Sequence, residues 1–126
     1  MPKKQVISIV DDDESVREST IDLFKSVGFA AVAYPSADVF LNSSQLRSTS
    51  CLIADVQMPG MTGFELHNSL VGSGNIIPTI LITAYPDDRD RSRARQVGVI
   101  GYLAKPLIGN DLLACVRSAL VSGGGR

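Results

Sequence analysis

A single carboxylate, Asp55, stands at the end of the apolar run CLIA (51–54) and directly before a loop. The loop is stiffened by Pro59 and loosened by Gly60 and Gly63. A charged group beside a core-like strand lowers stability unless another group pairs with it. Asp55 therefore either only begins a turn or is required for chemistry, and the polar residues at the other strand ends decide between these alternatives.

Several other groups suited to chemistry also follow apolar runs. They are the acids Asp11, Asp12 and Asp13, the hydroxyl of Thr83 and the ammonium group of Lys105. Two carboxylates about 4 Å apart repel each other by roughly 4 kcal/mol at an effective dielectric near 20, so a cluster of acids requires a cation. Mg²⁺ prefers oxygen ligands and also binds phosphate oxygens. Carboxylate, metal ion, lysine and hydroxyl together are suited to phosphoryl transfer onto an aspartate.

Five short runs rich in Val and Ile predict the strands that carry these groups. The runs are nearly continuous in apolar residues, which is typical of strands covered on both faces. Amphipathic patterns between them predict helices, with Ser36, Thr62 and Asn110 as expected N-caps. The predicted strands are 5–10, 29–34, 51–54, 78–83 and 99–104, and the predicted helices include 15–27 and the strongly polar segment 87–97.

The alternation of five strands with five helices predicts one α/β domain over residues 1–121, with a doubly wound, flavodoxin-like parallel sheet. The strand order 2-1-3-4-5 is one of two common orders for such sheets. In that order strands 1, 3, 4 and 5 are neighbours, so the acids, Thr83 and Lys105 meet Asp55 at the carboxyl edge, where ligands bind. Residues 122–126 (SGGGR) are expected to form a flexible tail.

Composition limits the classes of partner and the compartment. The net charge of −1 argues against a broad electrostatic surface for nucleic acid. The apolar stretch near the amino end is too short for a signal peptide or a membrane span, so we expect a cytoplasmic protein without membrane contact. Cys51 and Cys115 lie in apolar neighbourhoods without metal-ligand spacing, which predicts buried free thiols and suits a reducing compartment.

Four motifs resemble the receiver domain family of response regulators. The motifs are VDDDESVR, ADVQMPGMTGFEL, ILITAY and GYLAKP, and the resemblance extends from Val6 to about Leu120. Each motif alone is weak, but all four occur in order and at predicted strand ends. They are most similar to FixJ-type receivers, which accompany LuxR-type DNA-binding domains, or to receivers that stand alone.

The resemblance implies a role for each polar residue of the predicted edge. Asp55 would be the phosphoacceptor, and Lys105 would contact the phosphoryl group. Asp12 and Asp55 would bind Mg²⁺, or Mn²⁺ in its place, and Asp11 would act mostly through water. The backbone carbonyl of Gln57 would supply a further ligand.

The same resemblance implies a switch. Thr83 would also contact the phosphoryl group, and Tyr102 occupies the aromatic switch position, whose ring turns inward when Thr83 is drawn to the phosphate. The peptide bond between Lys105 and Pro106 would be cis. Gln57 and Tyr85 lie two residues beyond Asp55 and Thr83, at positions expected to tune the lifetime of the phosphoryl group.

The implied function is a signalling switch that catalyses only its own phosphorylation and dephosphorylation. Its donor would be a histidine kinase or a phosphotransfer protein that carries phosphohistidine. Phosphorylation would alter partner binding or homodimerisation, without direct nucleic-acid binding by this chain. Two alternatives remain open: a phosphorylation-independent binding module with this fold, and an aspartyl-phosphate phosphatase.

Some polar residues are also given purely structural interpretations. Asp13 or Glu14 suffices to cap the first helix, because acids favour a helix amino end. His67, the only histidine, is expected on a helix surface or half-buried, away from the strand ends. The polar segment 87–97 is expected to present a solvated face on which arginines 89, 91, 93 and 95 pair with aspartates 87, 88 and 90.

Overall fold

The computed structural model describes residues 5–124, which form five strands and five helices in alternation. The strands are β1 Val6–Val10, β2 Ala30–Tyr34, β3 Thr49–Asp55, β4 Thr79–Thr83 and β5 Gly101–Ala104. The helices are α1 Glu14–Ser26, α2 Ala37–Leu41, α3 Gly63–Gly72, α4 Asp88–Gln96 and α5 Gly109–Gly124. All strand pairs are parallel, and the order is β2-β1-β3-β4-β5. The predicted fold class and strand order are confirmed.

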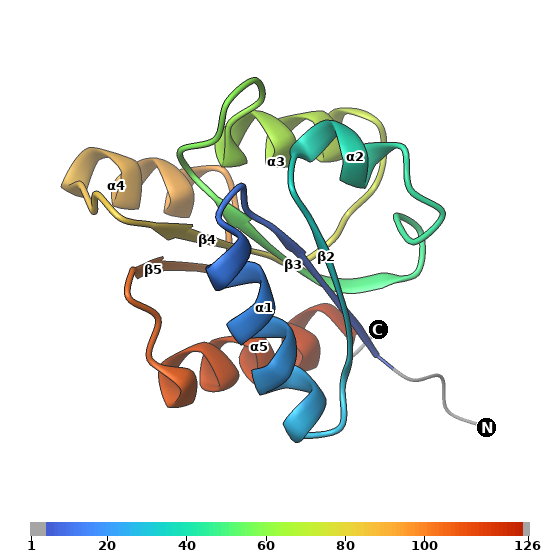
Figure 1. The fold of residues 1–126 in the computed structure, drawn as a ribbon. Helices are drawn as coiled ribbons and strands as arrows, with labels where there is room; N and C mark the ends of the chain where they lie inside the picture. The colour runs from blue at the N-terminus through green and yellow to red at the C-terminus, as the bar shows by residue number, and fades with distance from the viewer. Residues whose placement is uncertain (1–4, 125–126) are drawn as a thin grey trace.

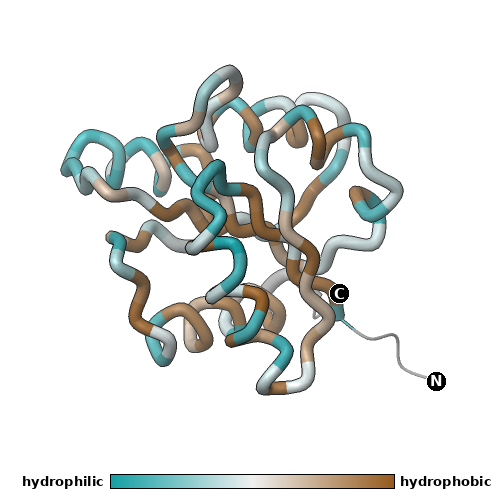
Figure 2. Tube along the Cα trace, viewed as in Figure 1, coloured by the Kyte–Doolittle hydropathy of each residue, from teal (hydrophilic) through white to brown (hydrophobic). Residues whose placement is uncertain are grey.

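The sheet is covered on both faces (Figure 1). Helices α2, α3 and α4 pack on one face, and α1 and α5 pack on the other. In β3, Leu52 and Ala54 belong to the core between the sheet and α2, α3 and α4, whereas Cys51 and Ile53 belong to the core between the sheet and α1 and α5. This alternation buries both faces of the strand, as its nearly continuous apolar run predicts. Figure 2 shows the same distribution, with hydrophobic residues along the central strands and a largely hydrophilic α4.

Polar side chains fix the starts of four helices. Asp13 accepts hydrogen bonds from the first turn of α1, and Ser36 does the same for α2. Thr62 forms a capping box with Glu65 at the start of α3, in which each side chain accepts from the backbone of the other. Asp87 caps α4. These caps satisfy backbone donors that no intrahelical partner reaches.

Helix α5 begins differently from the prediction. Asn110 was expected to cap this helix, but α5 begins at Gly109. Leu112 donates its backbone N–H to the carbonyl of Ile108 at 3.0 Å, so the first helical hydrogen bond starts from Ile108. Asn110 therefore lies inside the first turn. At its other end α5 extends to Gly124, so it includes 122–124 of the expected tail, and residues 125–126 lie outside the described chain.

Two strand starts differ from the sequence prediction by two residues, and the other three by one. β3 begins at Thr49, two residues before the predicted run, because Thr49 pairs with Val6 and its hydroxyl lies 2.7 Å from that of Ser8. β5 begins only at Gly101. Val99 instead donates to the carbonyl of Ala94 at 2.9 Å and belongs to the turn that ends α4. Tertiary hydrogen bonds, which a local pattern does not contain, set both limits.

Two further predictions concern cysteines and membranes. Cys51 and Cys115 are both free thiols, Cys51 buried and Cys115 partly buried. Burial raises the pKa of the Cys51 thiol to about 12, so it remains protonated at neutral pH. No helix within residues 5–124 has the length and apolar character needed to cross a membrane.

Candidate functional site

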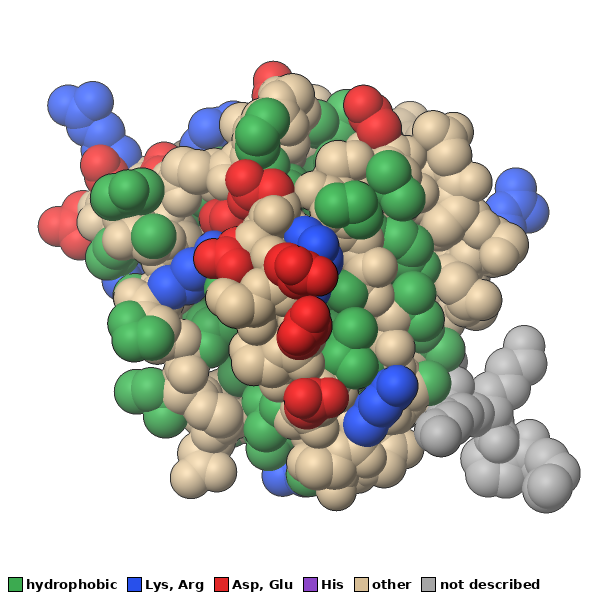
Figure 3. All heavy atoms as spheres, in the orientation of Figure 1, with side chains coloured by type: hydrophobic (Ala, Val, Ile, Leu, Met, Phe, Trp, Pro, Cys, Tyr) green, Lys and Arg blue, Asp and Glu red, His purple; other side chains and the backbone are tan. Residues whose placement is uncertain are grey.

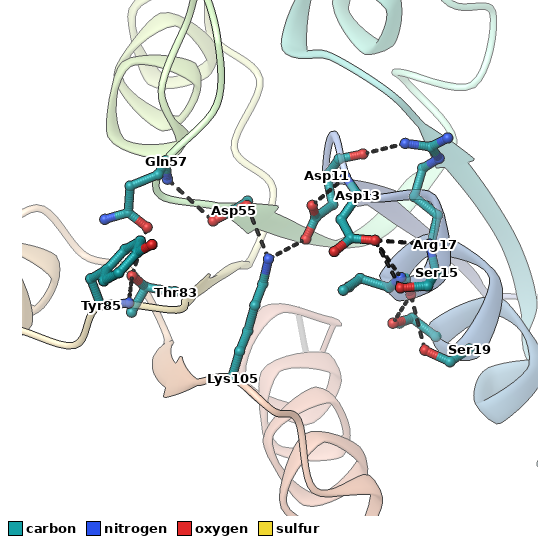
Figure 4. A network of polar contacts seen from close by, with 12 residues as sticks. Asp11, Asp13, Ser15, Arg17, Ser19, Asp55, Gln57, Thr83, Tyr85 and Lys105 are labelled. Carbon is teal, nitrogen blue, oxygen red and sulfur yellow. Dashed lines mark hydrogen bonds and ion pairs between the residues drawn. The ribbon is translucent and has the colours of Figure 1, made fainter.

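The fold brings the predicted polar residues to one edge of the sheet. Asp55 is the last residue of β3 and Thr83 the last residue of β4. Asp11 follows β1 directly, and Lys105 follows β5. Because the strands are parallel, all four positions lie at the carboxyl edge (Figure 4). Figure 3 shows acidic side chains in a row over α1 and the adjoining strand ends.

The ammonium group of Lys105 lies between two carboxylates. Its Nζ is 2.8 Å from Oδ2 of Asp11 and 3.0 Å from Oδ2 of Asp55. The contact to Asp55 also has hydrogen-bond geometry. The side chain of Asp11 is fully buried, that of Asp55 is 6% exposed and that of Lys105 is 15% exposed. Lys105 therefore compensates two charges that water reaches poorly.

This arrangement shifts the titration of Asp55 and Lys105. Burial raises the pKa of Asp55 above its usual value, and the charge of Asp11 adds to the rise, although Lys105 and the backbone N–H of Gln57 oppose it. Burial by itself would lower the pKa of Lys105, but its hydrogen bonds and charge interactions with Asp11 and Asp55 reverse this effect and raise it. The lysine is thus firmly protonated beside a carboxylate whose charge is costly.

The acids of the site divide into two roles. Asp13 caps α1, and its Oδ1 accepts from the backbone N–H of Ser15 at 2.9 Å. Asp11, Asp12 and Asp55 instead offer carboxylate oxygens that all lie within 4.8 Å of one another. This set consists of three carboxyl groups and so offers oxygen ligands only, which suits a hard divalent cation such as Mg²⁺ or Mn²⁺.

The β1–α1 and β3–α3 turns are held tightly around these acids. Arg17 donates to the backbone carbonyl of Asp11 at 2.8 Å and so anchors the first turn. In the second turn, Gly63 lies directly against the end of β3. A Cβ atom at Gly63 would stand 2.5 Å from the carbonyl oxygen of Asp55, so any side chain there would displace the backbone that carries the carboxylate. The peptide bond between Lys105 and Pro106 is cis.

Thr83 lies at this edge, but its hydroxyl is hydrogen-bonded to Gln57 and Tyr85 and not to Asp55. Its hydroxyl donates to Oε1 of Gln57 at 2.7 Å and accepts from the backbone N–H of Tyr85 at 3.0 Å. Within the described chain it makes no hydrogen bond to Asp55. The sequence predicted a backbone ligand at Gln57 and a position that tunes the lifetime of the phosphoryl group, but not this hydrogen bond of its side chain.

Tyr102 is already buried, with 8% of its surface exposed. Its hydroxyl accepts from the backbone N–H of Asp87 at 3.1 Å, and the guanidinium of Arg91 lies 4.9 Å from the centre of its ring. The ring is therefore held by the start and first turn of α4. No hydrogen bond between Tyr102 and Thr83 occurs in residues 5–124.

Most of the chain matches a known protein family. The model of the response regulator receiver domain matches residues 7–117. The chain belongs to the response regulator receiver family. As a receiver it is a domain of two-component signalling, in agreement with the four motifs.

Individual relatives support the same assignment. The receiver is 37% identical over 118 residues to the response regulator protein TmoT of Ectopseudomonas mendocina, covering 94% of this chain and 54% of TmoT. It is 33% identical to the transcriptional regulatory protein FixJ of Azorhizobium caulinodans, covering 95% of this chain and 57% of FixJ. The chain thus spans about half the length of these curated relatives. The solved structure of the response regulator StyR superposes with a TM-score of 0.90 at 35% identity, covering 98% of this chain and 63% of that one.

Two predictions about surface residues of the receiver are wrong. His67 is buried at 7% exposure, because it lies on the inner side of α3 with Phe64 and Leu70, three residues away in each direction. Burial lowers its pKa. The four arginines of α4 are exposed, as predicted, but they form no ion pair with the neighbouring aspartates in the part of the chain described here. Arg91 instead lies over Tyr102, and Arg93 lies 4.2 Å from the ring centre of Phe64.

Proposed function

We propose that this receiver accepts a phosphoryl group from a phosphohistidine donor onto a carboxylate oxygen of Asp55. A bond forms between that oxygen and phosphorus, while the bond between phosphorus and the donor's imidazole nitrogen breaks. The imidazole leaves and takes up a proton. The donor is a histidine kinase or a phosphotransfer protein. The acceptor is an activated carboxylate, which is an established kind of protein nucleophile.

The observation that carries this proposal is the position of Lys105 between Asp11 and Asp55, at 2.8 and 3.0 Å. Lys105 stays charged because of these two partners. Its ammonium group remains beside the Asp55 oxygen to which phosphorus is added, where it offsets the negative charge of the phosphoryl oxygens. A structural aspartate at a turn would require neither this lysine nor the two further acids.

Asp11, Asp12 and Asp55 are the residues that would hold Mg²⁺ or Mn²⁺, with the backbone carbonyl of Gln57 as a further ligand. The oxygen-only donor set within 4.8 Å supports this choice of ion. When bound, the ion supplies positive charge that neutralises the phosphoryl oxygens. Asp12 is the exposed member of the set, so it remains accessible from solvent.

Thr83 and Tyr102 would convert the added charge into a change of surface. A phosphoryl group brings about −1.5 to −2 charges, and strong acceptor oxygens close to the end of β4. The Thr83 hydroxyl donates to one of these oxygens, and Tyr102 transmits the change to α4 through its contacts with Asp87 and Arg91. Altered partner binding or homodimerisation is the output, and we place the reaction in the cytoplasm.

The decisive experiment is intact mass spectrometry after incubation with acetyl phosphate, with and without Mg²⁺. The wild-type chain should gain one phosphoryl group only with Mg²⁺, and Asp55→Asn should gain none. Asp38→Asn, an exposed aspartate on α2, is the matched control and should behave as wild type. If wild type neither gains mass nor binds Mg²⁺, a phosphorylation-independent binding module becomes the better account, and turnover of unrelated phosphoesters would support a phosphatase.

A further inference from the structure

We propose that Gln57 is a positioning residue that tethers the hydroxyl of Thr83 in the unphosphorylated receiver and competes with the phosphoryl group for it. This inference rests on the proposed function, because it concerns the donor that the phosphoryl group on Asp55 would use. It assigns the Gln57 side chain a role in the switching equilibrium, separate from any contact between its backbone and a metal ion.

The hydrogen-bonding capacity of Thr83 carries the argument. A hydroxyl has one hydrogen to donate. Thr83 donates it to Oε1 of Gln57 at 2.7 Å, and accepts from the backbone N–H of Tyr85 at 3.0 Å. Thr83 is fully buried, so water does not reach its hydroxyl, although the carboxamide of Gln57 is exposed. While the bond to Gln57 is present, Thr83 has no hydrogen left for a phosphoryl oxygen.

Gln57 also contacts the phosphoacceptor, which couples the two groups. Its backbone N–H donates to Oδ1 of Asp55 at 3.2 Å, while its side chain extends toward the end of β4 (Figure 4). The main chain of Gln57 is therefore fixed relative to Asp55, and its carboxamide reaches Thr83 without a large movement. A short chain of contacts links the carboxylate, Gln57 and the switch hydroxyl.

The carboxamide of Gln57 can leave Thr83 at little cost. The residue is exposed and lines a cleft of about 550 Å³ between the β3–α3 turn and α4, together with Phe64, Asp90 and Arg93. Water in this cleft can hydrogen-bond the released carboxamide. Release thus costs the bond to Thr83 and little else, so the tether opposes phosphorylation by about the net effect of one neutral hydrogen bond.

The state of Tyr102 indicates that this tether is the contact that phosphorylation must break. The ring of Tyr102 is already buried, and its hydroxyl is already bonded to the backbone of Asp87, while Thr83 is bonded to Gln57. An inward ring and a tethered Thr83 therefore coexist. The remaining polar rearrangement at the end of β4 is exchange of the Thr83 partner from Gln57 to the phosphoryl group.

The test is titration with beryllofluoride, a mimic of the phosphoryl group, in the presence of Mg²⁺. Calorimetry and backbone amide NMR shifts measure its binding. Gln57→Met keeps the length of the side chain but removes its acceptor. Gln96→Met makes the same change at an exposed position on α4 and serves as the matched control. Both are made in wild type and together with Thr83→Val, which removes the hydroxyl.

Gln57→Met should tighten beryllofluoride binding roughly 2- to 10-fold, the equivalent of one net hydrogen bond. Gln96→Met should leave it unchanged, and Gln57→Met should have no effect when combined with Thr83→Val. Binding by Gln57→Met that is equal to or weaker than that of wild type overturns the tether. The tether is also overturned if Gln57→Met tightens binding equally in a chain that already carries Thr83→Val. If wild type and Gln96→Met bind no beryllofluoride at all, the proposed function itself fails and the competition fails with it. If both bind it but Gln57→Met binds no tighter, only the tether fails, so the two outcomes can be told apart.

Discussion

Nζ of Lys105 lies 3.0 Å from Oδ2 of Asp55, although fifty positions separate the two residues in the chain. The same nitrogen lies 2.8 Å from Asp11. One lysine from the end of β5 thus joins the ends of β1 and β3, and it does so across the end of β4. The stability of this edge and the proposed phosphoryl transfer therefore involve the same ammonium group.

Replacing Lys105 by Met should destabilise the fold at pH 7. It leaves two buried carboxylates without their cation, and we expect a loss of roughly 2–3 kcal/mol, below the value for a fully buried pair because Lys105 is partly exposed. Urea unfolding measures this loss. The pKa of Lys105 is raised above 10.5, so the pair contributes fully below that pH and is lost as pH rises further. Wild type should therefore lose stability at alkaline pH, and Lys105→Met should not. If both chains lose the same free energy of unfolding as pH rises, the ion pair of Lys105 does not cause the loss.

Replacing Asp55 by Asn should make the fold more resistant to urea at pH 7. The pKa of Asp55 is raised by burial, so ionisation is unfavourable in the folded chain. For a group with a raised pKa, stability is highest below the ordinary value, 3.8, and falls as pH rises through the folded pKa. Each pKa unit corresponds to ~1.4 kcal/mol. The free energies of unfolding of wild type and Asp55→Asn, measured from about pH 3 to about pH 8, should converge at the acid end of this range. A variant less stable than wild type at pH 7 would show that the Lys105 contact outweighs burial.

Divalent cations should stabilise the wild-type fold through Asp12. A ligand that binds only the folded state at about 100 times its dissociation constant adds ~2.7 kcal/mol. Mg²⁺ should therefore raise the melting temperature, and chelation should reverse the rise. Asp12→Asn should weaken the effect, whereas Asp22→Asn, at an exposed aspartate of α1, should not. An equal response in both variants would mean that the ion acts elsewhere.

Strand ends and helix caps were predictable because their signals are local. An apolar run followed by an acid or a hydroxyl marks both the strand and its edge, and Ser36 and Thr62 cap their helices through contacts within three residues. Parallel topology then brings the ends of β1, β3 and β5 together without further information. Asp11, Asp55 and Lys105 could therefore be grouped before any distance was known.

Side-chain partners at the same edge were less predictable. The bond between Thr83 and Gln57 spans 26 positions, and no spacing rule distinguishes it from a bond to Asp55. His67 did carry a usable signal, because it lies three residues from both Phe64 and Leu70 on α3. For Arg91 and Arg93, nearby aspartates suggested local ion pairs, yet aromatic rings from other elements are their partners. Such choices depend on tertiary packing.

The contact between Arg93 and Phe64 should contribute measurably to stability. Cation–π contacts at exposed sites are worth about 0.5–1 kcal/mol. Arg93→Ala should lose this amount, whereas Arg95→Ala in the same last turn of α4 should lose less because no ring contact involves Arg95 in the described chain. Both changes alter helix propensity equally. Urea unfolding compares the two, and equal losses would assign the effect to charge rather than to the ring.

Removing the Tyr102 hydroxyl should loosen the start of α4. Tyr102→Phe keeps the buried ring but deprives the backbone N–H of Asp87 of its acceptor, and we expect a loss of about 0.5–1.5 kcal/mol. Hydrogen exchange at the Asp87 amide should quicken along with it. Tyr85→Phe is the matched control, because that side chain is 72% exposed and surface changes usually alter stability by less than about 0.5 kcal/mol. If the two variants behave alike, the hydroxyl of Tyr102 does not hold α4, and transmission from Thr83 would have to pass through the ring and Arg91 alone.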